Sequence, residues 1–282
     1  MTRYVVVGMD GSDGSRVAVR WAAKEAAARG LALRLVTVAP SGPWRGPSGP
    51  GHTARGERDA SPAKTGAAAV KQAYPDLDLG AREFSGKPAE ILAEVGQGAE
   101  VLVVGTRGTG GFDGLRLGSV ALEVAGRALC SVVLVPPEIS DREQGHELVV
   151  GVDARHPDDN ALGTAFREAG LRGARLRAVH AWDLPSRGRT FGRALEEDRA
   201  EWEDHEVQLL DDALHGWRQK HPEVSVLPDV RSFGAADALV RASAGAELLV
   251  VGRGPRHAVY LGGVTHAVAH HTHCPLMLAH RH

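Results

Sequence analysis

One stretch of the chain decides the fold: residues 101–119 read VLVVGTRGTGGFDGLRLGS. The apolar run at 101–104 predicts a buried parallel strand, because a strand covered on both faces is apolar throughout. Glycines fill the segment that follows, and residues 120–129 predict a helix. A strand, a glycine-rich loop and a helix N-terminus in this order favour a bound anion. Backbone N–H groups line such a loop, and a glycine has no Cβ to keep a phosphate away.

The composition is that of an ordinary globular protein. The 282 residues are 43% hydrophobic and 24% charged, and this length allows two domains of typical size. The formal net charge of −2 gives no sign of a nucleic-acid partner. No apolar run reaches the length of about 20 residues that crosses a bilayer, so we expect no membrane association. Two cysteines make no disulfide framework, which favours a cytoplasmic protein.

Strands and helices alternate through the first half. The expected strands are 4–9, 31–38, 77–84, 101–104 and 131–135, and the expected helices are 16–29, 62–74, 87–95 and 120–129. Residues 10–15 are typical of a turn and a helix cap, and residues 40–51 hold too much proline and glycine for regular structure. The alternation predicts an α/β fold, an open parallel sheet with helices on both faces.

The second half repeats the first. Residues 148–153, LVVGVD, match residues 5–10, VVVGMD, with an offset of 143 positions. Residues 245–252, GAELLVVG, match residues 98–105, GAEVLVVG, with an offset of 147. These matching segments occur in the same order in both halves, which predicts a tandem duplication. We expect one domain over 1–137 with an intact glycine loop, a polar linker over 138–146, and a second domain over 147–282 with a degenerate loop.

These features together resemble the universal stress protein family. The spacing Gly105-x2-Gly108-x9-Gly118-Ser119 is similar to the G-x2-G-x9-G-[ST] signature of the nucleotide-binding branch of that family. The duplication is similar to the two-domain members common in actinobacteria. The resemblance implies two Rossmann-like domains of the adenine nucleotide alpha hydrolase type, each with a five-stranded parallel sheet. It also implies that ATP, with Mg²⁺, binds between the ends of the first two strands and the glycine loop.

The resemblance assigns the nucleotide site residue by residue. Asp10 would be the carboxylate near the ribose or base, although it also suits a plain turn. The backbone near Val38 would face adenine, and Ser119 would bond a phosphate or cap the helix that follows. Arg107 is the loop cation that we expect to pair with phosphate, in preference to Arg116. The full expected set is Gly8, Met9, Asp10, Val38, Gly105, Arg107, Gly108, Gly118, Ser119 and Val120.

The second glycine loop departs from this signature. Pro255 stands where the spacing needs a glycine, glycine replaces the serine, and the loop is three residues shorter. Proline removes a backbone donor and the lost serine removes a hydroxyl. We therefore expect weak nucleotide binding in the second half, or none. The corresponding residues there are Asp153, Gly252, Gly262 and Gly263.

Three other groups of residues have ordinary explanations. The C-terminal histidines, with His266 and His270 on one expected helix face, lack the partners of a metal site, so no metal is expected. Cys130 and Cys274 occupy equivalent positions and fit small buried residues. A charged helix begins near residue 196, and its acidic residues are expected to be solvated rather than catalytic. Its apolar stripe would be Trp202, Leu209, Ala213 and Trp217.

The residues favour an ATP-binding regulator of the stress response over an enzyme. No Walker A pattern is present, and no lysine stands where it would reach a β- or γ-phosphate, so we assign no catalytic residue. Slow ATP hydrolysis and a structural module with a vestigial pocket are the alternatives. The resemblance further implies a homodimer, pairing between the two halves through 131–135 and 275–278, and a regulatory protein partner that the sequence does not name.

Overall fold

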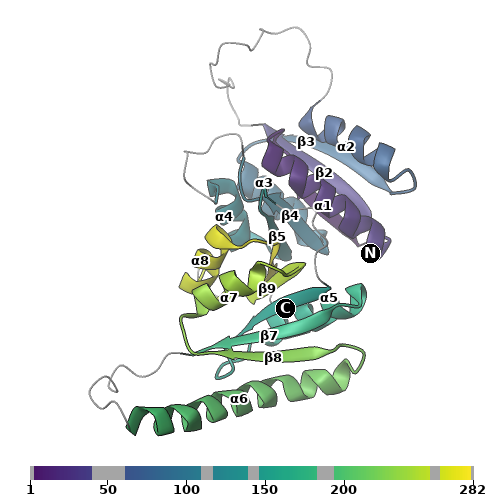
Figure 1. Cartoon of the computed structure of the whole chain (residues 1–282). Coiled ribbons are helices and arrows are strands. Elements are labelled where there is room, and N and C mark those ends of the chain that lie inside the picture. Colours follow the sequence, from purple (N-terminus) through teal and green to yellow (C-terminus); the bar gives the residue numbers. More distant parts are fainter. Residues whose placement is uncertain are drawn as a thin grey trace. The chain divides into compact units, whose positions relative to one another are not determined.

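The computed structural model describes residues 3–39, 61–108, 117–138, 146–182, 194–254 and 261–280 (Figure 1). Within these ranges, the side chains of residues 194–199 are not described. The chain divides into two compact units, formed mainly by residues 1–137 and by residues 138–282. These units are the first half and the second half of the molecule.

The described part of the first half holds a parallel sheet in the order β3-β2-β1-β4-β5. Its strands are β1 (Tyr4–Gly8), β2 (Ala32–Ala39), β3 (Leu79–Ser85), β4 (Val101–Gly105) and β5 (Ser131–Val135). Its helices are α1 (Asp13–Arg29), α2 (Pro62–Ala73), α3 (Pro88–Val95) and α4 (Ser119–Arg127), and a 3-10 turn, η1 (Gly96–Gly98), precedes β4. Helix α1 packs beside α2, and α3 packs beside α4 (Figure 1).

The described part of the second half repeats this arrangement in the order β10-β9-β6-β7-β8. Its strands are β6 (Glu147–Val152), β7 (Arg175–Ala181), β8 (Val226–Arg231), β9 (Leu248–Gly252) and β10 (Leu276–Ala279). Its helices are α5 (Asp159–Arg172), α6 (Ala194–Lys220), α7 (Ala235–Ser243) and α8 (Gly263–His271). The expected parallel α/β fold is therefore confirmed in both halves.

The core of each half lies along its central strands. Residues 5–7 and 102–103 are completely buried in the first half, as are residues 148–150 and 248–250 in the second. The registers also correspond, because Val5 lies opposite Val101 as Leu148 lies opposite Leu248. Burial on both faces explains why these strands are apolar throughout.

The expected elements are present, and their ends follow the caps. Helix α1 begins three residues before its expected start, because Ser12 is the N-cap and its Oγ accepts a hydrogen bond from Ser15 N at 3.1 Å. It ends where expected, at Gly30, whose left-handed backbone (φ 63°) suits glycine. Helix α4 ends two residues early, at Arg127.

The expected buried stripe of α6 is wrong in its register. The structure buries Leu210 and Leu214 completely, whereas Trp202 is 41% exposed. Trp217 does pack inward, stacked on Phe166 of α5 with ring centroids 6.0 Å apart. The expectation that every acidic residue near the start of this helix is solvated also fails, because Glu206 is buried.

Candidate functional site

Polar residues gather between β1 and β4. At this point the strand order β3-β2-β1-β4-β5 reverses, so that the chain continues on the other side of β1. In an open parallel sheet, ligands bind at the carboxyl ends of the strands beside this point. Gly8 ends β1 and Gly105 ends β4, and Asp10 follows β1 directly. Asp10 Oδ1 accepts hydrogen bonds from the backbone N of Ser12 at 2.9 Å and from its Oγ at 2.6 Å. Asp10 therefore does form the plain turn, with its other oxygen directed to the glycine loop.

Glycines bring that loop against the start of α1. A Cβ on Gly108 would lie 2.6 Å from Oδ2 of Asp10, so the loop and this carboxylate are in contact. A Cβ on Gly14 would lie 2.5 Å from the carbonyl oxygen of Arg107, and one on Gly105 would lie 2.8 Å from the backbone of Gly14. The structure thus places four of the expected residues together, namely Asp10, Gly105, Arg107 and Gly108. The Arg107 side chain is exposed.

The start of α4 lies beside the end of β4. Gly118 is the N-cap, and its N–H donates to the carbonyl of Thr106 at 2.7 Å. Of the two roles expected for Ser119, capping α4 is wrong, because Gly118 is the N-cap and Ser119 is already the first helical residue. Ser119 and Val120 are exposed. The first N–H groups of α4 thus have the geometry that binds anions.

The end of β2 is fixed by side-chain bonds rather than by apolar contact alone. Thr37 Oγ1 donates to the carbonyl of Met9 at 2.8 Å and accepts from the N–H of Ala63 at 2.9 Å. The side chain of Met9 packs against Gly66 of α2 and is buried, so any contact of Met9 with a ligand would come from its backbone. Val38 is half-buried on β2.

Several residues singled out in the sequence lie outside the described ranges. They are residues 40–51, Gly110, Gly111, Gly114, Arg116, Pro255, His257 and His282.

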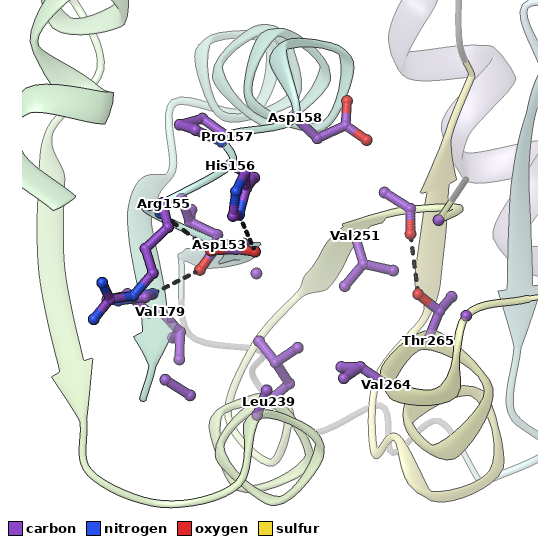
Figure 2. A pocket seen from close by; sticks show the side chains of 18 of the residues that line it. Asp153, Arg155, His156, Pro157, Asp158, Val179, Leu239, Val251, Val264 and Thr265 are labelled. Carbon is purple, nitrogen blue, oxygen red and sulfur yellow. Dashed lines mark hydrogen bonds and ion pairs between the residues drawn. The ribbon is translucent and has the colours of Figure 1, made fainter. Parts of the chain in front are cut away.

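The second half has a cavity of about 1030 Å³ at the equivalent edge of its sheet (Figure 2). It is lined by the ends of β6, β7 and β9 and by the starts of α5 and α8. All four residues expected there line it, namely Asp153, Gly252, Gly262 and Gly263. Val179, Leu239 and Val251 supply an apolar wall.

A buried polar cluster beside this cavity was missed by the sequence reasoning. His180 Nε2 donates to Oε2 of Glu206 at 2.9 Å, and Arg155 forms an ion pair with the other oxygen of Glu206. His180 and Glu206 are 2% and 1% exposed. His180 Nδ1 lies 3.1 Å from the carbonyl of Val152, where Thr37 bonds the matching carbonyl in the first half. The offset of 143 positions that relates Asp10 to Asp153 also relates Thr37 to His180. Alignment of the two halves could therefore have pointed to His180.

A carboxylate stands beside the second glycine loop. Asp158 is the N-cap of α5, and its Oδ1 accepts from Asn160 N at 3.0 Å and from Ala161 N at 3.3 Å. Its Oδ2 occupies the place where a Cβ on Gly252 would lie. In the first half the backbone of Gly14 takes the same place against Gly105.

The histidines of α8 do lie on one helix face, because the rings of His266 and His270 are 4.7 Å apart. Burial, followed by the charges of His266 and His271, lowers the pKa of His270. Within the described ranges, no three His, Cys, Asp or Glu residues gather closely enough to hold a metal ion. Both cysteines are buried free thiols, as expected. No helix in the described part of the chain is long and apolar enough to span a membrane.

The fold and the two strand-edge sites define a tandem α/β protein of Rossmann-like type. The sequence profile of the universal stress protein family matches residues 1–136 and 146–280. The chain is 31% identical over 293 residues to universal stress protein Rv2005c of Mycobacterium tuberculosis, covering 98% of this chain and 96% of that one. It is 32% identical over 301 residues to universal stress protein Rv1996 of the same organism, with 98% and 94% covered.

Solved structures agree on the fold. A protein of unknown function, PA1789 from Pseudomonas aeruginosa, gives a TM-score of 0.67 at 14% identity, covering 99% of this chain and 92% of that one. A universal stress protein from Archaeoglobus fulgidus gives 0.64 at 14% identity over the full length of both chains. The chain therefore belongs to the universal stress protein family, as a tandem member with two family domains.

Proposed function

We propose that this protein binds ATP, with Mg²⁺, through its first half and acts as a nucleotide-dependent regulator in the stress response. The contact between Gly108 and Asp10 carries the proposal, because it joins a carboxylate at the end of β1 to a phosphate-type loop at the end of β4. The N-cap of α4 is Gly118, which has no side chain to cap the helix, whereas the Ser12 side chain caps α1. An uncapped helix start next to a glycine loop is suited to phosphate.

Each kind of residue in the first half would contact a different part of the ligand. The N–H groups at Ser119 and Val120, with the Ser119 hydroxyl and Arg107, would hold phosphate oxygens. Gly105 and Gly108 would let the backbone approach them, and Asp10 would accept hydrogen bonds from the nucleoside. Mg²⁺ would neutralise phosphate charge, because magnesium binds proteins mainly together with substrate phosphates.

Bound ATP would favour one conformation of the first half by mass action, since a ligand stabilises the state that binds it. We expect the effect to reach a regulatory protein partner, and we expect the chain to form a homodimer with its two halves paired through 131–135 and 275–278. Two buried free thiols are compatible with action in the cytoplasm. The slow ATPase and the non-binding module are the alternatives.

Titration calorimetry with Mg·ATP, after removal of co-purified nucleotide, tests the proposal on a matched pair of variants. The backbone of Gly118 is extended (φ −77°, ψ 154°), and a Cβ there would make only an ordinary contact with Thr106 O at 3.4 Å. Both Gly118→Asn and Gly118→Asp should therefore fold. We expect one ATP per chain, a modest loss for Gly118→Asn because its side chain caps α4, and a further loss of roughly thirtyfold or more for Gly118→Asp from repulsion of phosphate.

The other outcomes separate the alternatives. Equal affinities in Gly118→Asn and Gly118→Asp would mean that phosphate does not reach this helix start. A stoichiometry of two would contradict a silent second half. ADP that accumulates over many turnovers would favour the ATPase, and an absence of heat would favour the non-binding module.

A further inference from the structure

The cavity of the second half differs in charge from a phosphate site. Among the described residues, its lining includes the carboxylates of Asp153, Asp158 and Asp159, one arginine, Arg155, and His156, which pairs with Asp153 at 3.4 Å. That arginine is already paired with the buried Glu206. Arg253, which directly follows β9, is not among the lining residues. A phosphate group entering this cavity would therefore meet more negative than positive charge among the described lining residues.

A carboxylate stands at the end of β9, where the second glycine loop begins. Asp158 Oδ2 lies in contact with Gly252, the last residue of that strand. The start of α5 holds this carboxylate in place, because the other oxygen of Asp158, Oδ1, accepts a hydrogen bond from Asn160 N at 3.0 Å. Gly263, the first residue of α8, carries no hydroxyl to offset this charge.

A second and independent observation points to a ligand. Trp182 lines the cavity and is 6% exposed, and its Nε1 has no hydrogen-bond partner among the described residues. Its ring also contacts Trp202 of α6, with centroids 6.5 Å apart. A buried N–H without an acceptor is costly, so an indole in this position favours a ligand that supplies one.

The remaining lining suits a flat and uncharged molecule. Val179, Leu239 and Val251 give apolar surface for a ring, as Figure 2 shows. Asp153 and Asp158 are acceptors for hydroxyl or amino groups. The volume of about 1030 Å³ is ample for such a molecule.

We propose that the second-half cavity binds an uncharged heteroaromatic ligand of the nucleoside class that carries no phosphate. A ring acceptor of this ligand takes the hydrogen bond of Trp182 Nε1, and its hydroxyls donate to Asp153 and Asp158. The ligand class thus differs from the ATP proposed for the first half. This inference does not rest on that proposal, because its residues all belong to the second half.

The test uses the full chain with Gly118→Asp in the first half, titrated separately with adenosine and with Mg·ATP by calorimetry. We expect one adenosine per chain, with ATP at least tenfold weaker. Trp182→Phe should weaken adenosine about fivefold or more, as the loss of one hydrogen bond predicts. Adenosine bound in the first half would be insensitive to Trp182→Phe, which separates the two halves.

A charge variant gives a second readout that is independent of Trp182. Asp158→Asn keeps the N-cap of α5, since asparagine caps as well as aspartate does, and removes the negative charge. It should raise the affinity for ATP relative to adenosine at least fivefold, while Asp204→Asn, an exposed carboxylate on α6, should leave the ratio unchanged. If Trp182→Phe lowers the melting temperature of the chain, the test is decided by the ratio of ATP to adenosine affinity in the Asp158→Asn variant.

Three results would overturn the inference. The first is no adenosine binding at millimolar concentration in the Gly118→Asp chain. The second is ATP binding in that chain that is as tight as adenosine binding and equally sensitive to Trp182→Phe. The third is an affinity ratio that Asp158→Asn does not move. None of these results bears on ATP binding by the unmodified first half.

Discussion

Gly14 is a helical glycine that packs against a loop far away in the sequence, and this loop leaves no space for a side chain. It lies in the first turn of α1, where alanine would ordinarily improve the helix by about 1 kcal/mol or less. Here a Cβ would lie 2.5 Å from the backbone carbonyl of Arg107, and a backbone atom cannot rotate aside as a flexible side chain can. The glycine loop and α1 must therefore separate if the residue grows.

Gly14→Ala should lower the free energy of unfolding by about 1–3 kcal/mol, the range typical of overpacking. It should also weaken Mg·ATP, because Arg107 and Gly108 shift with the displaced loop. The matched control is Gly216→Ala in α6, where a Cβ would have no neighbour within 4 Å. That change should raise stability by about 0.5–1 kcal/mol. Urea unfolding checks both, and the same sign for the two variants would contradict the packing argument.

Cys274 predicts a dependence of stability on alkaline pH. Burial raises the pKa of its thiol to about 12, whereas the unfolded chain ionises near the ordinary value of 9.0. Above pH 9 the unfolded state loses a proton that the folded state keeps, so the free energy of unfolding falls as pH rises through this window. The limiting slope is about 1.4 kcal/mol per pH unit.

The measurement compares the natural chain with Cys274→Ala by urea unfolding at pH 8 and pH 10. The advantage of the natural chain over the variant should shrink by roughly 1 kcal/mol between these values. Other groups titrate alike in both chains and cancel in the difference. An advantage that is constant with pH would mean that the thiol is not held protonated by the fold.

At the scale of elements, the sequence predicts what depends on local pattern. The strand pattern at 101–104 and the glycine at position 30 suffice to locate β4 and the end of α1, because burial on two faces and a left-handed cap each demand particular residues. The register of the buried face on α6 is not predicted. Trp202 and Leu210 are both apolar, and only the packing of α6 against its neighbours decides that Leu210 is buried.

The candidate sites follow the same division. The order of strand, loop and helix is enough to bring Asp10 and Gly108 to one edge of the sheet, because parallel strands end together there. Glu206 and Trp182 escape such reasoning. Glu206 lies in a run of charged residues that looks solvated, and its bond to His180 of β7 depends on how α6 packs on β8 and α5.

Glu206 joins α6 to β7, so we expect that replacing its side chain weakens the attachment of the two elements to each other. Glu206→Ala leaves the buried His180 Nε2–H without its acceptor and Arg155 without its partner. We expect a loss of about 2–3 kcal/mol, toward the low end for a broken buried pair because Arg155 is half-exposed. Glu206→Gln, which keeps an acceptor, should cost less.

The control for this prediction is Glu201→Ala, an exposed glutamate on the same helix, which should change stability by less than about 0.5 kcal/mol. Unfolding in urea measures all three variants. If Glu206→Ala is as mild as Glu201→Ala, the cluster of Arg155, His180 and Glu206 contributes nothing to the attachment of α6.

At the scale of the whole molecule, one topology is used twice with different side chains at the same edge. Thr37 of the first half corresponds to His180 of the second, and the neutral cap Ser12 corresponds to the anionic cap Asp158. The N-caps of α4 and α8 are both glycines, Gly118 and Gly262, which have no side chain to cap the helix. The strand order is therefore retained while the charge at the edge changes, and the two halves are expected to prefer different ligands.

Calorimetric melting of the full chain tests this division of ligands. Each half has its own buried strands, so we expect two transitions, assigned by Gly14→Ala for the first half and Glu206→Ala for the second. Mg·ATP should raise the first-half transition and adenosine the second-half one, each by an amount set by its own affinity. At a hundred times the dissociation constant, a ligand adds about 2.7 kcal/mol to the half that binds it. A transition pair that both ligands raise equally would contradict separate ligand classes, because stabilisation by mass action requires binding to the half concerned.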